Sequence, residues 1–402
     1  MPAITHCKVC CAPLPPPYLD LGNQPPANNL VAMVDHSTGE GSATYPLAVT
    51  VCSVCDLSQL TYAVDPETLF SHYLYTPSQG NFFKQHFKQM AEDLIRDLAL
   101  LPGDRVVDIG SNDGLLLSYF QDAGMLVTGV EPAQNLAAAA NKAGIPTLNL
   151  FWGKGALPMA PRSANLITAT NVFAHVENLH EFVSAVEEAL TPQGTFVFEV
   201  AGLLEMVNHG TIDLVYHEHL YYWSLSPLHR LFELYGLTLI DIKPVPSHGG
   251  SIRVFVQRAG SGDGDSPSIS RIFDRVYDEA RLADRAIKEL PLAAQAIHAS
   301  LRWQLASLVG KKVVGYGAPA KATVLVNYCS FTSRSLSYIV DDNPLKQGHY
   351  IPGSDIPIYG SEQLTIDPPD AVLIFPWNVA SDIRPKLEAL GITNIIVPFA
   401  GP

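Results

Sequence analysis

Four of the six cysteines are spaced like metal ligands. Cys7 and Cys10 form one Cys-x-x-Cys knuckle, and Cys52 and Cys55 form a second. Two intervening residues let both thiolates of a tight turn face one ion, and two knuckles complete a closed tetrahedral site of the structural type. We therefore predict one structural Zn²⁺ on these four residues. A redox pair or unlinked buried thiols are the alternative, and the other two cysteines have no partner at ligand spacing.

A glycine-containing loop is the second candidate site. The segment 108–114, Asp-Ile-Gly-Ser-Asn-Asp-Gly, follows an apolar run and precedes a helical one. Such turns let the backbone approach a ligand at the carboxyl edge of a sheet. Asp108 and Asp113 offer acceptors to an ammonium group, and Glu131, roughly 20 residues on, ends the next strand, where an acid binds both ribose hydroxyls. An adenosine with an amino-acid tail fits these groups, and this stretch resembles class I methyltransferases. A nicotinamide enzyme is the alternative, although the loop lacks the full Gly-x-Gly-x-x-Gly pattern.

Acid–base groups are concentrated in the segment 216–219, Tyr-His-Glu-His. Imidazole ordinarily titrates near neutral pH and is the commonest general base. If this segment is extended, Tyr216 and Glu218 share one face, and His217 and His219 share the other. A structural histidine is an equal alternative for His217. His175 follows a predicted strand and is expected where substrate meets cofactor.

A dinucleotide-like pattern lies in the last third of the chain. Gly315-x-Gly317-x-x-Ala320 follows a predicted strand, and Asp341 follows the next one. This is the spacing of a nicotinamide-binding fingerprint. Pro319 makes a regular helix start inside the loop harder, although proline is tolerated in a first helical turn. Taken alone, the pattern therefore predicts nicotinamide binding.

Alternating strands and helices must position these groups. In the middle part we predict strands at 105–110, 126–130, 145–150, 164–170 and 195–199, a helix at 181–190, and an antiparallel pair at 237–243 and 251–257. The last part is predicted to begin with one long helix whose apolar stripe is a packing surface: Ile269, Ile272, Phe273, Val276, Ala280, Ala283 and Ile287. Further strands are predicted at 312–316, 336–340, 371–375 and 394–399. The fold class is therefore α/β, a class I methyltransferase Rossmann-like domain with an N-terminal zinc-binding module and a second, C-terminal Rossmann-like α/β domain.

Length and charge limit the organisation and the partners. A chain of 402 residues suggests two or three domains, predicted here as a zinc-binding module at 1–77, a methyltransferase domain at 78–262 and a Rossmann-like domain at 263–402. The formal charge of −14 disfavours nucleic acid. No apolar run approaches the roughly 18 residues of a bilayer span, and the first ten residues do not look like a secretory signal, so we expect a cytoplasmic enzyme without a membrane partner. The stretch between the two knuckles is longer than in usual zinc ribbons and is expected to loop out at Pro25–Pro26 and at 39–41.

Motifs along nearly the whole chain, taken in order, resemble the three-domain sugar C-methyltransferases that modify nucleotide-linked keto-hexoses. They are the two knuckles, Asp20-Leu-Gly-Asn-Gln-Pro-Pro-Ala-Asn-Asn29, Tyr73-Leu-Tyr-Thr-Pro-Ser78, the 108–114 loop, Asn171-Val-Phe-Ala-His175, Tyr216-His-Glu-His-Leu220, His248-Gly-Gly-Ser-Ile-Arg253, Gly315-Tyr-Gly-Ala-Pro-Ala-Lys321 and Asp341-Asp-Asn-Pro-Leu-Lys-Gln-Gly348. The family usually has a small hydroxyl residue where this chain has Pro77.

This resemblance implies methyl transfer from S-adenosylmethionine to a carbon, C-3', of a 4-keto-hexose linked to dTDP or a similar nucleotide. Removal of the hydrogen beside the ketone gives an enolate, so a base is needed. The family resemblance implies His219 as that base, with Tyr216, Glu218, His175 and Tyr75 around it. It implies these cofactor-binding residues: Asp108, Gly110, Ser111, Asn112, Asp113, Glu131 and Asn171. It also implies substrate binding by His248, Lys321 and Lys346, with the two lysines facing a diphosphate on a relic dinucleotide fold.

Three other hypotheses remain open from the sequence. One is a nicotinamide oxidoreductase that uses the C-terminal domain. Another is a zinc-ribbon interaction protein with an inactive methyltransferase domain, which the presence of Asp108 and Glu131 disfavours. The last is a methyltransferase that acts on oxygen or nitrogen instead of carbon.

Overall fold

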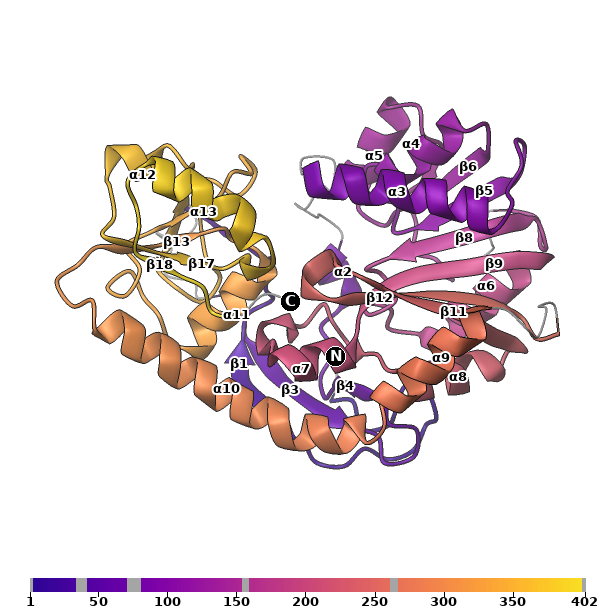
Figure 1. Cartoon of the computed structure of the whole chain (residues 1–402), viewed down its shortest axis with the longest axis horizontal. Helices are drawn as coiled ribbons and strands as arrows, with labels where there is room; N and C mark the ends of the chain where they lie inside the picture. The colour runs from indigo at the N-terminus through magenta and orange to yellow at the C-terminus, as the bar shows by residue number, and fades with distance from the viewer. Residues whose placement is uncertain (1–2, 34–41, 71–80, 154–158, 261–266, 400–402) are drawn as a thin grey trace.

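The computed structural model describes residues 3–33, 42–70, 81–153, 159–260 and 267–399, and these form three sheets. Figure 1 shows the large central sheet in magenta on one side and the C-terminal unit in yellow on the other, with the indigo N-terminal strands between and below them. The mixed α/β architecture predicted from the sequence is confirmed. Within the described residues, no helix is both long and apolar enough to cross a membrane.

The N-terminal sheet is antiparallel and carries the cysteine knuckles at its end. Its strands, in spatial order, are β1 (Leu19–Gln24), β3 (Tyr45–Val51), β4 (Ser58–Leu60) and β10 (Tyr221–Tyr222). Part of the stretch between the knuckles is strand, because β1 and β3 pair with each other, so the insertion does not loop out along its whole length. Pro25–Pro26 do lie outside strands, directly after β1, whereas 39–41 lie outside the described residues.

The central sheet has seven strands in the order β11-β12-β9-β8-β5-β6-β7. Their bounds are β5 (Arg105–Ile109), β6 (Leu126–Val130), β7 (Thr147–Leu148), β8 (Ala164–Thr170), β9 (Leu190–Ala201), β11 (Leu237–Val245) and β12 (Ser251–Arg258). The predicted antiparallel pair is confirmed as β11 and β12, and β12 pairs antiparallel with β9. The five predicted strands of the middle part are also present, with a shorter β7 and a longer β9.

Helices cover this sheet and bury its apolar faces. They include α3 (Asn81–Asp97), α4 (Leu115–Asp122), α5 (Gln134–Lys142), α6 (Leu179–Ala189) and α8 (Leu225–Glu233). α6 begins where the Asn178 side chain accepts a hydrogen bond from the Glu181 amide at 3.2 Å, and it buries Phe182 on the sheet. Phe173, Phe196 and Phe198 are fully buried beside it, and each such ring stabilises the fold by about 1.5–3 kcal/mol.

The strand order fixes where a ligand can bind. β5 is hydrogen-bonded to β6 on one side and β8 on the other, so the order of the parallel strands reverses at β5. In open parallel sheets the crevice at such a switch point receives the ligand beyond the carboxyl ends of the strands. The loop 108–114 follows β5 at this edge.

The C-terminal unit is a second, mainly parallel sheet with the order β18-β17-β13-β14-β16-β15-β2. Its strands are β13 (Val313–Tyr316), β14 (Ile339–Val340), β15 (His349–Tyr350), β16 (Pro357–Tyr359), β17 (Ala371–Ile374) and β18 (Ile395–Ile396), joined by β2 (Val31–Ala32) from the N-terminal segment. Its helices are α11 (Ala320–Tyr328), α12 (Gln363–Ile366) and α13 (Ala380–Ala389), with a 3-10 turn η4 (Trp377–Val379). The predicted second parallel α/β unit is therefore confirmed.

The prediction of one long helix before this unit is wrong in one respect. Two helices, α9 (Pro267–Asp278) and α10 (Leu282–Ala306), replace it, because Arg281 has a left-handed φ of 62° that ends the run. The stripe is also not simply a packing surface, since Phe273 is 68% exposed and Val276 is 53% exposed. α9 is held instead by arginines that pair with buried or half-buried carboxylates.

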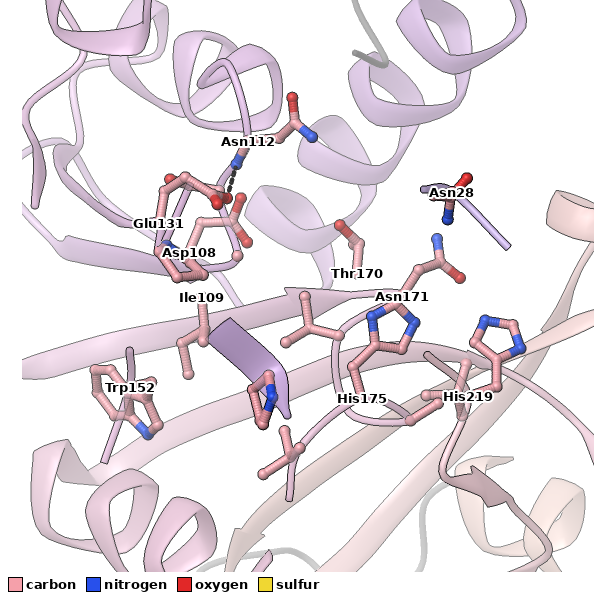
Figure 2. Close-up of a pocket in the computed structure, with 18 of the residues that line it drawn as sticks. Asn28, Asp108, Ile109, Asn112, Glu131, Trp152, Thr170, Asn171, His175 and His219 are labelled. Carbon is pink, nitrogen blue, oxygen red and sulfur yellow. Dashed lines mark hydrogen bonds between the residues drawn. The ribbon is translucent and has the colours of Figure 1, made fainter. Parts of the chain in front are cut away.

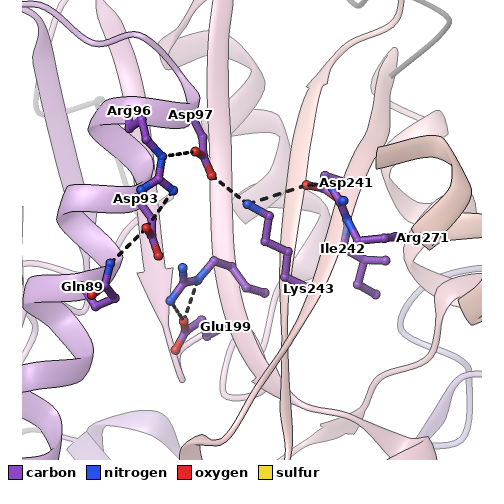
Figure 3. Close-up of polar contacts among 10 residues, drawn as sticks. Gln89, Asp93, Arg96, Asp97, Glu199, Asp241, Ile242, Lys243 and Arg271 are labelled. Carbon is purple, nitrogen blue, oxygen red and sulfur yellow. Dashed lines mark hydrogen bonds and ion pairs between the residues drawn. The ribbon is translucent and has the colours of Figure 1, made fainter. Parts of the chain in front are cut away.

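Polar contacts fasten the outer face of the central sheet to its helices. Figure 3 shows Lys243 of β11 between Asp97 of α3, at 2.8 Å, and Asp241, at 3.9 Å. Arg271 of α9 closes this row on Asp241 at 2.7 Å. The shorter elements that complete the fold are α2 (Pro66–Phe70), α7 (Leu203–His209), η2 (Ile212–Leu214) and η3 (Ser247–Gly249).

Candidate active site

A pocket of about 410 Å³ opens at the carboxyl edge of the central sheet, and all three parts of the chain line it. Asn28 and Leu30 come from the N-terminal segment, and Lys321 and Lys346 come from the C-terminal unit. Figure 2 shows Asp108, Glu131 and Trp152 toward one end of the pocket and His175, His219 and Asn28 toward the other. The predicted cofactor loop and three of the predicted acid–base residues, Tyr216, His219 and His175, thus face one space.

The strand β5 delivers Asp108 into the pocket. Its carboxylate is 2% exposed and accepts a hydrogen bond from the Thr168 hydroxyl at 2.7 Å. Burial raises the pKa of Asp108 to about 7, and the nearby Glu131 charge adds to the rise. Gly110 follows with a φ of 66°, and a Cβ there would lie 2.4 Å from the Val172 side chain, so only glycine fits this turn.

The loop after β5 is tied to the end of β6. Glu131 accepts from the Asn112 amide and from the Ala133 amide, both at 2.8 Å, while burial raises its pKa. Two polar atoms that line the pocket, the Ser111 hydroxyl oxygen and one Asp113 carboxylate oxygen, are buried and have no hydrogen-bond partner among the described residues. A ligand that carries donors therefore fits this loop.

Two aromatic residues beside this loop were not singled out from the sequence. Phe151 and Trp152 line the pocket shortly after β7, and the Trp152 indole donates to the Phe182 carbonyl at 3.3 Å. A flat aromatic ligand group can pack in such surroundings. Their place after the third predicted strand was the available signal, but aromatic residues at strand ends usually belong to the core.

The segment 216–219 forms a turn, so the extended alternative is wrong. The His219 amide donates to the Tyr216 carbonyl at 2.9 Å, which brings the two side chains onto the same side. The Tyr216 hydroxyl lies 2.7 Å from His219 Nε2, and His219 Nδ1 lies 2.9 Å from the Leu214 carbonyl. A carbonyl only accepts, so Nδ1 carries the hydrogen, and in the neutral ring Nε2 accepts from Tyr216.

The turn sends its other two side chains elsewhere. Glu218 is 2% exposed and is not among the described residues that line the pocket. One of its oxygens accepts from both the backbone amide and the side-chain amide of Asn28, at 3.2 and 3.0 Å. His217 is fully buried, lies 3.3 Å from the Tyr45 carbonyl and has its pKa lowered by burial. Tyr216 and His219 are thus in the pocket, whereas Glu218 and His217 lie against the N-terminal segment.

His175 and Asn171 come from the loop after β8. The ring centroids of His175 and His219 are 5.1 Å apart, and burial lowers the pKa of His175 to about 4, so this ring is neutral at pH 7. Asn171 has a left-handed φ of 57°, and Figure 2 shows it near His175. Strained non-glycine residues of this kind are concentrated at functional sites.

The two predicted substrate lysines line the same pocket from the C-terminal unit. Lys321 is 6% exposed, with its ammonium 3.0 Å from Asn378 and 4.3 Å from the centroid of the Trp377 ring. Burial lowers its pKa to about 8. Lys346 donates to the Ala318 carbonyl at 2.9 Å and lies 3.6 Å from Asp341.

Two predicted site residues have no described side chain. Tyr75 lies outside the described residues, and so does the whole Tyr73–Ser78 motif. His248 lies in η3, but its side chain is not among those described. The placement of these two side chains relative to the pocket stays a prediction.

The predicted metal ligands converge. The four sulfur atoms of Cys7, Cys10, Cys52 and Cys55 all lie within 4.8 Å of one another. Amides of both knuckles donate to sulfur, as when Val54 donates to Cys52 at 3.4 Å. Four converging thiols without a further ligand fit a closed, structural zinc site. The remaining two cysteines, Cys11 and Cys329, lie outside this cluster.

The carboxylate of Asp341 is hydrogen-bonded to the dinucleotide-like loop of the C-terminal unit. Asp341 accepts from the Ala318 amide at 2.7 Å and from the Asn343 amide at 2.8 Å. Pro319 precedes the first residue of α11, so the helix starts at Ala320. In working dinucleotide sites the equivalent acid accepts the ribose hydroxyls.

Known family models match three successive parts of the chain. Residues 7–70 match a zinc binding domain, residues 82–242 a methyltransferase domain, and residues 246–398 a C-methyltransferase C-terminal domain. The C-methyltransferase NovU of Streptomyces niveus is 34% identical over 99% of this chain and 96% of its own length. The chain belongs to the S-adenosylmethionine-dependent C-methyltransferases.

The resemblance found in the sequence is thereby confirmed, and this C-methyltransferase is an enzyme that uses S-adenosylmethionine and holds a structural zinc ion. Solved structures also match part of the chain. The PH0226 protein of Pyrococcus horikoshii is 14% identical with a TM-score of 0.39, covering 48% of this chain and 97% of its own. An S-adenosylmethionine-dependent methyltransferase of Mesorhizobium loti is 18% identical with a TM-score of 0.36, covering 43% and 100%. Both scores are below 0.5, and the family membership does not depend on them.

Proposed function

We propose that this C-methyltransferase acts on a nucleotide-linked 4-keto-hexose and places the methyl group on C3, beside the ketone. The observation that carries the proposal is the Tyr216–His219 pair, which has a fixed tautomer and opens onto the same pocket as Asp108 and Glu131. Methylation of carbon requires a nucleophilic carbon. A ketone makes the neighbouring hydrogen removable, so a positioned base beside the cofactor site fits that chemistry.

The proposed reaction assigns the proton to His219. The C3–H bond breaks, its proton goes to Nε2, and the electron pair is delocalised onto the ketone oxygen as an enolate. S-adenosylmethionine supplies the electrophilic methyl group that this carbon takes up. In the resting geometry Nε2 accepts the Tyr216 hydroxyl, which must turn aside or pass the proton on. Both routes end with a proton on Nε2, while Nδ1 keeps its hydrogen and donates it to the Leu214 carbonyl.

The cofactor is proposed to lie along the β5 and β6 edges. Asp108 and Asp113 are proposed to accept from its ammonium group, and Glu131 from the ribose hydroxyls. The cofactor site is completed, in this proposal, by the other residues predicted from the sequence: Gly110, Ser111, Asn112 and Asn171. The half-buried Phe151 and the buried Trp152 are proposed to add an apolar surface for the adenine.

The substrate is proposed to enter between the central sheet and the C-terminal unit. His175 is neutral and lies beside His219, which suits it to hydrogen-bond the sugar without adding charge. Lys346 is half-buried at the pocket wall, and with Lys321 it is proposed to balance the diphosphate. His248 and Tyr75 keep their predicted roles in substrate binding and catalysis.

The proposal is tested by measuring release of S-adenosylhomocysteine with a panel of nucleotide-linked sugars. We expect turnover with 4-keto-hexoses and none with the matching 4-hydroxy sugars, since those have no removable hydrogen beside a ketone. Equal turnover with both would favour methylation of oxygen, and turnover with amino sugars alone would favour nitrogen.

A further inference from the structure

The 3-10 turn η2 connects the C-terminal unit to the proposed base. Its middle residue, Asp213, is fully buried and accepts a hydrogen bond from the Trp377 indole at 2.7 Å. The next residue, Leu214, provides the carbonyl to which His219 Nδ1 donates at 2.9 Å. One short turn thus makes a contact with the C-terminal unit through a side chain and a contact with His219 through its backbone.

The partner of Asp213 is itself held from several sides. The face of the Trp377 ring lies 4.3 Å from the Lys321 ammonium, whereas its N–H edge faces Asp213. The ring centroids of Phe399 and Trp377 are 5.6 Å apart, and a Cβ on Gly249 would lie 2.1 Å from the indole. The absence of a side chain at Gly249 therefore lets the Trp377 ring pack directly against the backbone of η3.

Charge also favours this arrangement. Lys321 attracts the Asp213 carboxylate, and both groups contact the same indole, the ammonium over its face and the carboxylate at its N–H edge. The second oxygen of Asp213 is buried without a hydrogen-bond partner among the described residues. A fully buried carboxylate is costly unless its position is fixed by donors and an opposite charge. Nothing in the reaction itself uses Asp213, so its burial calls for a role at η2.

We propose that Asp213 is a positioning residue for the base: held by Trp377 and Lys321, it fixes η2 so that the Leu214 carbonyl keeps the hydrogen of His219 on Nδ1. Nε2 is then the unprotonated ring nitrogen and can accept a proton. This inference rests on the proposed role of His219, and it makes the C-terminal unit a part of the catalytic geometry as well as of substrate binding. A base shifted by about 1 Å can lose on the order of 10²-fold in rate.

Three variants of the full-length protein test the inference. Asp213→Asn keeps the shape and an acceptor but removes the charge, and Trp377→Phe keeps the ring over Lys321 but removes the N–H donor. The matched controls are Asp284→Asn and Trp303→Phe on α10, because both side chains are exposed. The double variant of Asp213 and Trp377 measures whether the two residues act as one unit.

The first readout is the tautomer of His219, followed by NMR of protein with ¹⁵N-labelled histidine rings and assigned with His219→Asn. We expect a single Nδ1–H form in the wild type and both controls, and a mixture of the two tautomers in Asp213→Asn and Trp377→Phe. An unchanged single tautomer in both variants would overturn the inference, and this readout needs no substrate.

The second readout is turnover with the best 4-keto sugar of the panel. We expect kcat to fall by roughly 10- to 100-fold in each variant, with KM nearly unchanged and no further loss in the double variant. A change confined to KM would contradict a positioning role. A shifted tautomer with normal kcat would support the positioning of His219 by Asp213 but would show that His219 is not the base. Failure of this inference and failure of the proposed function can therefore be told apart.

Discussion

At the scale of single residues, two buried carboxyl groups, Asp108 and Glu131, lie at the carboxyl ends of neighbouring strands and line the same pocket. The spacing around Asp108 and Glu131 predicted a strand-turn-helix loop and a second strand, since both are local patterns, and both are present. The direction of Glu218 was not predictable, because it depends on Asn28, which is 190 positions away along the chain. For the same reason the Asp213–Trp377 contact could not be predicted from the sequence.

Affinity for S-adenosylmethionine should depend on pH through Asp108. Burial raises its pKa to about 7, so at pH 6 the free protein carries mostly the neutral acid, which cannot balance an ammonium group. Affinity should therefore rise between pH 6 and 7.5, by about tenfold per pH unit at most. Calorimetry over this range checks it, with Asp108→Asn expected to give a flat profile. A flat wild-type profile would remove Asp108 from the ammonium site.

Glu131→Gln should weaken cofactor binding by about 1–3 kcal/mol, because a buried charged acceptor is lost. The substitution also disturbs the loop after β5. Glu131 accepts hydrogen bonds from two backbone amides, and in the variant one of these amides would face the glutamine NH₂ group. Glu188→Gln is the matched control, because that residue is exposed on α6. Wild-type affinity of the Glu131 variant in calorimetry would show that this residue does not bind the cofactor.

At the scale of elements, the zinc cluster and the catalytic turn belong to one sheet. β10 begins two residues after His219 and pairs with β4, which follows the second knuckle. Strand pairing over this separation was not visible in the sequence, because β10 is only two residues long and carries no periodic signal. The break between α9 and α10 was missed for a related reason, since no glycine or proline marks Arg281.

Loss of zinc should therefore reduce turnover more than cofactor binding. Cys55→Ser is expected to lower both the zinc content and kcat, because β4 loses its anchor and with it β10, while the β5 and β6 edges stay intact. Cys11→Ser is the control, since this exposed cysteine lies outside the cluster. Elemental analysis and turnover are measured together. A zinc-free variant with full turnover would contradict this link.

At the scale of the whole molecule, three parts of the chain enclose one pocket. The two mainly parallel sheets were predictable from alternating apolar runs, but their placement around the pocket was not. It depends on contacts such as that of Thr323 in α11 with the Ala27 carbonyl, at 2.8 Å. Such contacts join residues 296 positions apart, and single-sequence patterns carry no information about them.

The C-terminal unit should show no saturable binding of NAD or NADP. Both oxygens of Asp341 already accept backbone amides, and Lys346 lies 3.6 Å away, so the acid has little capacity for a ribose. Calorimetry at millimolar dinucleotide checks this expectation. A micromolar dissociation constant would revive the oxidoreductase hypothesis for this unit.

The most direct test of the proposed reaction follows a ¹³C-labelled methyl group from S-adenosylmethionine into a nucleotide-linked 4-keto-hexose by NMR. We predict a methyl singlet on a fully substituted carbon beside the ketone. We also predict that His219→Asn binds the cofactor normally and slows this transfer by roughly 10²–10⁴-fold, with a milder effect for His217→Asn. A label on oxygen or nitrogen, or a near-wild-type rate in His219→Asn, would contradict carbon methylation with His219 as the base.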